Sequence, residues 1–197
     1  MTFRLGGLTL PYIHHPYNYT SNNERAVEVA VGLYLLSKAN RALEVGAVLP
    51  HYLPKWPKGA HEVIDLYEKC PGVTNADVLS YIPRGQYDLV LSISTLEHLH
   101  RAADIEMAIT RMKSWLKDGG MLFVTIPHGY RSEVDELVYS GKLAMDVARM
   151  DKMDTERNLW EERPLSDAPK SYGWPTRNAH TVYLCFYRQG GGRWDRF

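Results

Sequence analysis

Three positions in the first half of the chain carry the clearest chemistry in the sequence. The apolar run Ala42–Val45 predicts a buried strand that contains one acid, Glu44, and Gly46 follows it directly. A residue without a Cβ lets the backbone turn sharply at that point. Nineteen residues later a second apolar run ends on Asp65. A glycine turn after one strand and a carboxylate at the tip of the next is typical of α/β domains that hold the ribose of a nucleoside.

The chemistry of these positions is specific enough to assign provisional roles. Gly46 and Ala47 would bring bare backbone close to a ligand. Asp65, ionised at neutral pH, can accept two hydrogen bonds from a ribose diol, each worth about 1.5–3 kcal/mol. A helix cap or a solvated loop acid is the alternative reading of Asp65.

Two histidines are candidates for proton transfer. His98 follows the fourth predicted strand and His128 follows the fifth, so both fall at the carboxyl edge of a parallel sheet. A neutral imidazole there can take the proton of an acceptor hydroxyl. His98 is equally well explained as a structural partner of its loop, and His14 and His15 are weaker candidates. A metal site through Glu97, His98 and His100 is a weak alternative, because nothing else in the chain has ligand spacing, and no metal is expected.

The elements that position these residues alternate between strand and helix. A capped helix is expected from Ser21 to Leu36, one around Ile105–Leu116 and one after Ser132. Strands are expected near 41–45, 61–65, 73–75, 87–93, 120–126, 157–163 and 180–188. This alternation predicts an α/β fold with a mostly parallel sheet and helices on both faces. The last two strands are joined by a Pro/Gly-rich loop, Pro164–Pro175, without a crossover helix, so the last strand should run antiparallel.

The order of the motifs resembles the class I S-adenosylmethionine-dependent methyltransferases. The resemblance covers about Arg41 to Pro127 and rests on RALEVG, NADVLSY, YDLVLSISTLEHL and WLKDGGMLFVTIP. The turn departs from the family pattern, since only Gly46 of its three glycines is present. The variant turn EVGAVLPHY is similar to that of a small, mostly uncharacterised subgroup. Asn23–Glu28 and Asn158–Glu161 match two further segments of that subgroup.

The resemblance implies a Rossmann-like seven-stranded sheet in the order 3-2-1-4-5-7-6 and further cofactor contacts. Asp77 would read the adenine amine, with the backbone N–H of Val78 donating to the ring; a simple turn residue is the alternative for Asp77. Glu44 would position the methionine end of the cofactor. Ser92 and Ser94 lie where the fourth strand ends, and that backbone lines the methionine moiety in the family.

Other nucleotide cofactors fit the sequence less well. The chain has no Gly-x-x-x-x-Gly-Lys-Ser/Thr loop for a nucleoside triphosphate. The sequence Val48-Leu49-Pro50 provides no nest of amides for a pyrophosphate, which disfavours NAD. Without the later glycines a methionine sulfonium is still accommodated. The expected cofactor is therefore S-adenosyl-L-methionine, with S-adenosyl-L-homocysteine as product.

Length and composition set the remaining expectations. The 197 residues suit a single domain, 1–197, with an extended N-terminal arm (1–20) and a flexible Gly-rich tail (190–197). The arm either folds over the cofactor as a lid, as in the family, or packs on the sheet. The net charge of zero disfavours a nucleic-acid partner, and no apolar run is long enough for a membrane span. Two cysteines without a disulfide pattern suit a cytoplasmic protein. The oligomeric state, including a homodimer, stays open.

The expected function is methyl transfer to a small hydroxylated acceptor, such as a sugar or natural product. Two alternatives remain open at this stage. One is a catalytically silent partner that keeps the fold. The other is a nucleic-acid-modifying enzyme, which the absence of a basic excess and of an Asn/Asp-Pro-Pro-aromatic motif in SISTLEHL disfavours.

Overall fold

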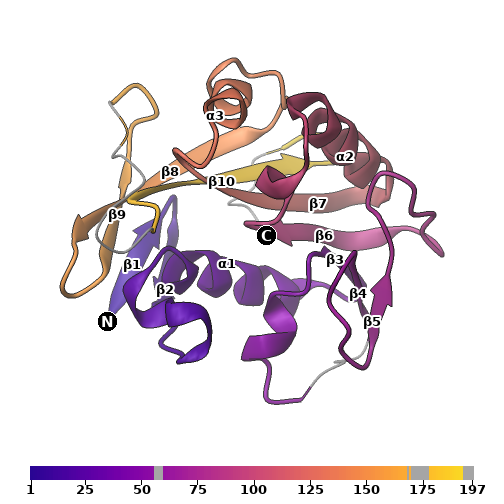
Figure 1. The fold of residues 1–197 in the computed structure, drawn as a ribbon, viewed down its shortest axis with the longest axis horizontal. Coiled ribbons are helices and arrows are strands. Elements are labelled where there is room, and N and C mark those ends of the chain that lie inside the picture. The colour runs from indigo at the N-terminus through magenta and orange to yellow at the C-terminus, as the bar shows by residue number, and fades with distance from the viewer. Residues whose placement is uncertain (56–59, 168, 170–177, 193–197) are drawn as a thin grey trace.

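A twisted sheet of eight strands forms the centre of the computed structural model, which describes residues 1–55, 60–167, 169 and 178–192 (Figure 1). The order across the sheet is β5-β4-β3-β6-β7-β10-β8-β9. The strands span β3 Ala42–Val45, β4 His61–Asp65, β5 Val73–Asn75, β6 Tyr87–Ile93, β7 Leu116–Pro127, β8 Asp146–Asp154, β9 Leu159–Arg163 and β10 Thr181–Arg188. Strands β3 to β7 pair with one another in parallel, and β10 runs antiparallel to both β7 and β8. The predicted Rossmann-like α/β fold and its antiparallel last strand are confirmed.

The sixth strand was predicted at the wrong place. Residues 157–163 were expected beside the last strand, but that position belongs to β8, and β9 pairs outside it as an eighth, edge strand. The β8 sequence carries Arg149, Asp151 and Lys152, which hide its strand pattern. In the structure Arg149 is 1 % exposed because its guanidinium pairs with the Asp151 carboxylate. A sequence pattern places charged residues in solvent, but here the ion pair allows Arg149 and Asp151 to be buried.

Helices cover both faces of the sheet, and the sheet separates the hydrophobic core into two halves (Figure 1). Helix α1 (Arg25–Lys38) packs on one face, and α2 (Ala102–Ser114) and α3 (Ser132–Tyr139) lie on the other. Within β6 the side chains of Leu89 and Leu91 join the α1 half, whereas Val90 joins the α2 half, as strand alternation requires. A Cβ at Gly32 would lie 2.8 Å from Ile93 Cδ1, so glycine allows α1 to approach the end of β6 closely.

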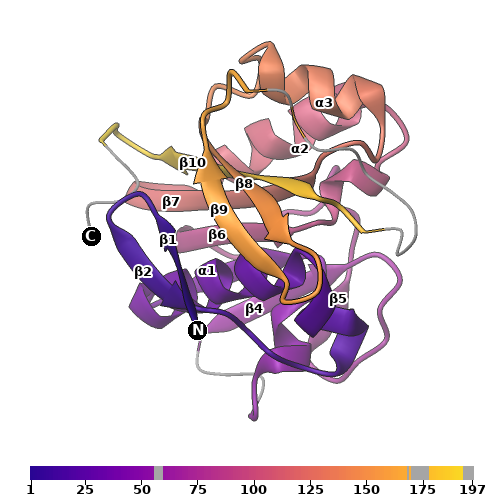
Figure 2. The same ribbon diagram turned by 90° about the vertical axis from the view of Figure 1, so that its left-hand side faces the viewer.

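The N-terminal segment is a folded hairpin and a short helix rather than the expected extended arm. Strands β1 (Thr2–Leu5) and β2 (Leu8–Pro11) pair with each other, and a 3₁₀ helix, η1 (Tyr17–Asn22), follows. Figure 2 shows the hairpin beside β9, where Gly6 N donates to Glu162 Oε2 at 2.7 Å. The alternation of Phe3 and Leu5 with polar residues was the overlooked signal. Both side chains are buried in the α1 half of the core.

The C-terminal predictions are described only in part. Gly190, Gly191 and Gly192 have positive φ angles of 83°, 87° and 103°. Residues 193–197 of the predicted tail and most of the loop 164–175 lie outside the described residues. In the described part of the chain, no helix combines the length and apolar character that crossing a membrane requires.

Candidate active site

A cavity of about 590 Å³ opens where β3, β4 and β6 end. It lies at the point where the strand order reverses, between β3 and β6, which is where open α/β sheets bind ligands. The wall contains five predicted residues: Gly46, Asp65, Asp77, Val78 and His98. The other wall residues are Val45, Ile64, Leu66, Tyr67, Ala76, Leu79, Thr95, Leu96, Leu99, His100 and Asp104.

Glu44 stabilises the turn after β3 through hydrogen bonds to its backbone amides. Gly46 has φ +89°, a conformation that favours glycine. Glu44 Oε1 accepts hydrogen bonds from the amides of Val48 and Leu49 at 2.8 and 2.7 Å, and Oε2 lies 2.9 Å from His61 Nε2. Glu44 has no solvent exposure and is not part of the cavity wall. The Glu44 carboxylate is thus engaged by the turn and by His61, and its contact with the methionine end of the cofactor stays a prediction.

The Asp65 carboxylate sits at the tip of β4 and is oriented by backbone amides. Its Oδ1 accepts from the amides of Tyr67 and Glu68, both at 2.8 Å, and its Oδ2 accepts from Ala47 at 3.1 Å. An ionised carboxylate offers about four lone-pair sites, so capacity remains for a ligand hydroxyl in the cavity. Ala47 thus contributes by fixing Asp65, and it does not itself line the cavity.

Asp77 and Val78 present an acceptor next to a donor. Asp77 Oδ1 accepts from the Leu79 amide at 2.8 Å. Asp77 therefore stabilises a turn, which was the alternative role predicted for it. Within the described residues, no group donates to Asp77 Oδ2 and the Val78 N–H has no acceptor. Both residues line the cavity. A free carboxylate oxygen beside a free amide matches the amine and ring nitrogen of adenine, so the site fits the expected cofactor.

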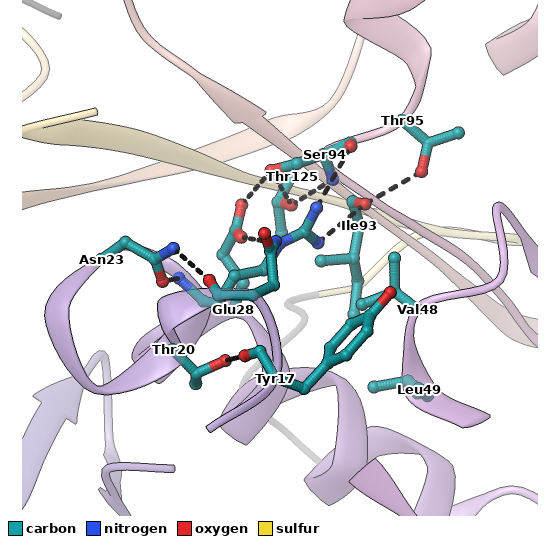
Figure 3. A network of polar contacts seen from close by, with 12 residues as sticks. Tyr17, Thr20, Asn23, Glu28, Val48, Leu49, Ile93, Ser94, Thr95 and Thr125 are labelled. Atoms are coloured by element: carbon teal, nitrogen blue, oxygen red, sulfur yellow. Dashed lines mark hydrogen bonds and ion pairs between the residues drawn. The ribbon is translucent and has the colours of Figure 1, made fainter. Parts of the chain in front are cut away.

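Ser92 and Ser94 shape the end of β6 and are not part of the cavity wall. Ser92 Oγ donates to Val45 O at 2.8 Å, which ties β6 to β3. Ser94 has φ 38°, its amide donates to Thr125 Oγ1 at 2.9 Å, and its hydroxyl donates to Glu28 Oε1 at 2.5 Å (Figure 3). The next residue, Thr95, faces the cavity instead. The sequence argument missed Thr95 because it lies beyond the strand, where side-chain alternation no longer applies.

The structure separates the two candidate bases. His98 lines the cavity, and its Nδ1 lies 2.9 Å from the hydroxyl of Tyr130. Partial burial, together with the nearby Arg25 guanidinium, lowers the pKa of His98 below its usual 6.5 and keeps the ring neutral at neutral pH.

His128 is turned toward α3 and is absent from the cavity wall as described. Its Nδ1 lies 2.9 Å from the Tyr183 hydroxyl and 3.1 Å from Asp135 Oδ1. Neither His14 nor His15 lines the cavity, and the His15 ring packs at a tilt against Tyr52, with ring centroids 5.0 Å apart. Of the four histidines considered, only His98 lines the cavity.

Three acids that each keep one carboxylate oxygen away from solvent were missed by the sequence analysis. Glu24 and Glu28 lie at the start of α1, and Glu97 lies in the 3₁₀ helix η3 (Leu96–His98). Burial raises the pKa of Glu97 to about 8 and, with the charge of Glu28, that of Glu24 to about 7. In the described residues, no group of three or more His, Cys, Asp or Glu is arranged to hold a metal ion. The segment Asn23–Glu28 had been noted only as a family resemblance, because its acids follow the spacing of an ordinary helix start.

The chain belongs to a methyltransferase family. The family described as "Methyltransferase domain" matches residues 34–177, which is more than half of the chain. S-adenosylmethionine is the methyl donor of this family. No curated protein sequence matches the chain significantly.

Solved structures share the fold. The N-methyltransferase NodS from Bradyrhizobium japonicum WM9, in complex with S-adenosyl-L-homocysteine, aligns with a TM-score of 0.54 and 16% identity. That alignment covers 85% of this chain and 88% of NodS. Magnesium protoporphyrin IX methyltransferase from Synechocystis PCC 6803, with bound S-adenosylmethionine, aligns with a TM-score of 0.50, 13% identity and coverage of 90% and 86%. At these identities the likeness concerns the fold alone.

Proposed function

We propose that this protein transfers a methyl group from S-adenosylmethionine to a hydroxyl of a small acceptor, such as a sugar or natural product. The observation that carries the proposal is the position of His98, whose ring lines the same cavity as Asp65 and Asp77. The cofactor supplies an electrophilic methyl group on a sulfonium, a good leaving group. The protein then has to hold the acceptor in line and accept its proton.

The cavity residues divide between the two tasks. Asp65 and Asp77, with the Val78 amide, supply a ribose acceptor and an adenine-reading pair at one part of the wall. Thr95 and His98 follow β6 and reach the cavity from the strand end next to it. His98, kept neutral, can take the acceptor proton as the C–O bond forms, while Tyr130 orients its other ring nitrogen.

Methyl transfer from labelled S-adenosylmethionine to a panel of sugars, glycosides and phenols tests the proposal. Labelled acceptor whose formation depends on His98 is the expected result. Cofactor binding without transfer to any hydroxyl would contradict O-methylation and favour the silent-partner alternative. Failure to bind S-adenosylhomocysteine would overturn the cofactor site as well.

A further inference from the structure

The loop between β7 and α3, residues 128–131, reaches across to the segment that carries His98. The Tyr130 hydroxyl lies 2.9 Å from His98 Nδ1, and the two rings meet edge to face with their centroids 5.0 Å apart. His98 lines the cavity, whereas Tyr130 is not part of its wall. Any effect of Tyr130 on a bound acceptor would therefore pass through the His98 ring.

Arg131 fastens the 128–131 loop to the segment directly after His98. Its Nη1 donates to Leu99 O, and its Nη2 donates to His100 O at 3.0 Å. A guanidinium holds its donors in a rigid planar fork, so two bonds to successive carbonyls fix the separation of the two segments. The distance between the Tyr130 hydroxyl and the His98 ring is therefore set by the contacts of the neighbouring residues.

The other end of the 128–131 loop is held by α3 and β10. The Gly129 amide donates to both carboxylate oxygens of Asp135, each at 3.1 Å, and the His128 amide donates to Thr181 O at 3.0 Å. Gly129 has φ 83°, a backbone conformation that favours glycine. The loop is thus anchored at this end through its backbone amides.

The contact with Tyr130 decides which nitrogen of His98 can act as a base. A neutral imidazole carries one proton, so one nitrogen donates and the other accepts. If the Tyr130 hydroxyl donates to Nδ1, the ring proton is on Nε2, and Nε2 cannot take another. If Nδ1–H donates to the tyrosine oxygen instead, Nε2 keeps its lone pair. No hydrogen bond from the described residues reaches Nε2, and Glu97 Oε1, at 3.8 Å, is beyond hydrogen-bond distance.

We propose that Tyr130 is a positioning residue that accepts the Nδ1 proton of His98 and so leaves Nε2 as the base of the methyl transfer. The inference rests on the proposed function and assigns a role to a residue outside the cavity wall. His98 Nε2 takes the proton of the acceptor oxygen as that oxygen bonds the methyl carbon, and the electrons of the broken C–S bond stay on sulfur. The imidazolium that results keeps its Nδ1–H on the Tyr130 oxygen, which Arg131 holds in place.

The charges around His98 give this hydrogen bond its importance. Burial, followed by the charge of the Arg25 guanidinium on α1, lowers the pKa of His98. Burial also raises the pKa of Glu97 in η3 to about 8, so this acid is largely uncharged at neutral pH. Asp104, at the start of α2, lines the same cavity but pairs with Arg101. The tyrosine oxygen therefore stabilises the imidazolium, because a hydrogen bond to the charged form favours that form.

The tautomer of His98 can be measured on the full chain without turnover. NMR of the protein labelled with ¹⁵N-histidine distinguishes Nδ1–H from Nε2–H, and His98→Gln identifies the His98 signals among those of the eight histidines. We expect Nδ1–H in the wild-type protein and a loss of that preference in Tyr130→Phe. Predominant Nε2–H in the wild-type protein would overturn the inference.

Tyr130→Phe keeps the ring contact with His98 and removes only the hydroxyl. We expect kcat on a hydroxyl acceptor to fall about 10-fold, the scale of one hydrogen bond to a charged group, with KM and S-adenosylhomocysteine affinity nearly unchanged. The acid limb of the pH–rate profile should move to lower pH, because the imidazolium loses its acceptor. Tyr187→Phe is the matched control, since the Tyr187 hydroxyl donates to Gln189 Oε1 at 2.9 Å and neither residue lines the cavity. An unchanged profile in Tyr130→Phe, or equal losses in both variants, would overturn the inference.

A double-mutant cycle tests the part played by Arg131. Arg131→Gln alone should lower kcat, but in the Tyr130→Phe background it should cost little more, because the hydroxyl that it positions is gone. Arg131→Lys serves in its place if Arg131→Gln does not fold. Additive losses would overturn the role of Arg131 in positioning the hydroxyl. Normal activity of Tyr130→Phe beside an inactive His98→Gln would refute this inference alone, whereas full activity of His98→Gln would refute the proposed function on which it rests.

Discussion

Gly46 lies directly against the side chain of Thr95, so that a Cβ on Gly46 would stand 2.2 Å from Thr95 Oγ1 and 2.7 Å from Cγ2. The contact joins the turn after β3 to the segment after β6, and both residues line the cavity. Thr95 Oγ1 donates to Ile93 O at 2.9 Å, which fixes the side chain in this place. Glycine is thus required at position 46 both by its positive φ angle and by the close approach of the Thr95 side chain.

Gly46→Ala should destabilise the protein and weaken cofactor binding. The positive φ alone costs an L-residue about 1–2 kcal/mol, and displacement of Thr95 adds to that cost. Urea unfolding and S-adenosylhomocysteine titration measure the two effects. Adding Thr95→Ala should recover part of the stability, because it removes the contacts with Oγ1 and Cγ2 but leaves the Thr95 Cβ at 2.9 Å and the backbone strain. A Gly46→Ala protein with wild-type stability would contradict the geometry.

Asp65→Ala and Asp77→Ala should each weaken S-adenosylhomocysteine binding by about 1–3 kcal/mol, the range for a lost charge-assisted hydrogen bond. Asp65→Ala should also loosen the loop after β4, because three amides lose their acceptor. Calorimetry at neutral pH measures the affinity. The exposed Asp118→Asn, at the start of β7, serves as the control. Unchanged affinity in both cavity variants would remove these residues from the cofactor site.

His98→Gln should lower kcat by about 10²–10⁴-fold on a hydroxyl acceptor and leave cofactor affinity nearly unchanged. His128→Gln should leave kcat within a few-fold, because His128 contacts Tyr183 and Asp135 away from the cavity. Steady-state kinetics of both variants decide between them. A larger loss in His128→Gln would reverse the assignment of the base.

The wild-type rate should fall as pH drops, with a midpoint below the ordinary imidazole pKa of 6.5. Burial, followed by the charge of Arg25, lowers the pKa of His98, so the basic form persists to lower pH. A pH–rate profile of kcat measures the midpoint, and His98→Gln should lose this limb. A midpoint clearly above 6.5 would exclude His98 in this environment as the base.

Glu97→Gln should be more stable than the wild-type protein at alkaline pH. The pKa of Glu97 is raised from 4.5 to about 8, so the folded state binds more protons than the unfolded state between these values. The stability from the protonated acid is complete below about pH 4.5 and is lost as pH rises through about 8. The variant cannot ionise, so its advantage should grow to about 1–3 kcal/mol at high pH. Urea unfolding across pH measures it, and a pH-independent difference would contradict the raised pKa.

Tyr12→Phe should destabilise the fold by about 1–3 kcal/mol, because it leaves a buried amide without an acceptor. The Tyr12 hydroxyl accepts from Trp160 N at 2.8 Å and donates to Trp160 O at 3.1 Å, which fastens the N-terminal segment to β9. Tyr19→Phe, on an exposed side chain, is the matched control. Equal unfolding curves for both variants would show that the hairpin is held by apolar packing alone.

The sequence determined the central strands of the sheet and several residues of the cavity wall. Gly46 and Asp65 could be placed from sequence because a glycine turn and a strand-end acid are properties of short segments. The parallel direction of β3 to β7 followed from the alternation of strands and helices, and their order followed from the family resemblance. Asp77 and Val78 came from family resemblance, and their free acceptor and donor became visible only in the folded loop.

Tertiary structure decided everything that depends on contacts between distant segments. The charged residues of β8 prevented its prediction from the sequence, and only the structure shows that Arg149 and Asp151 are buried as an ion pair. The hydrogen bonds from Glu44 to the turn became visible only in the folded protein. The direction of each side chain decided that His98 lines the cavity and that His128 does not. Burial raises the pKa of Glu97 in η3, and the charge of Glu28, which lies on α1 about seventy residues earlier, adds to that shift. Desolvation and close approach arise only when separate segments pack together.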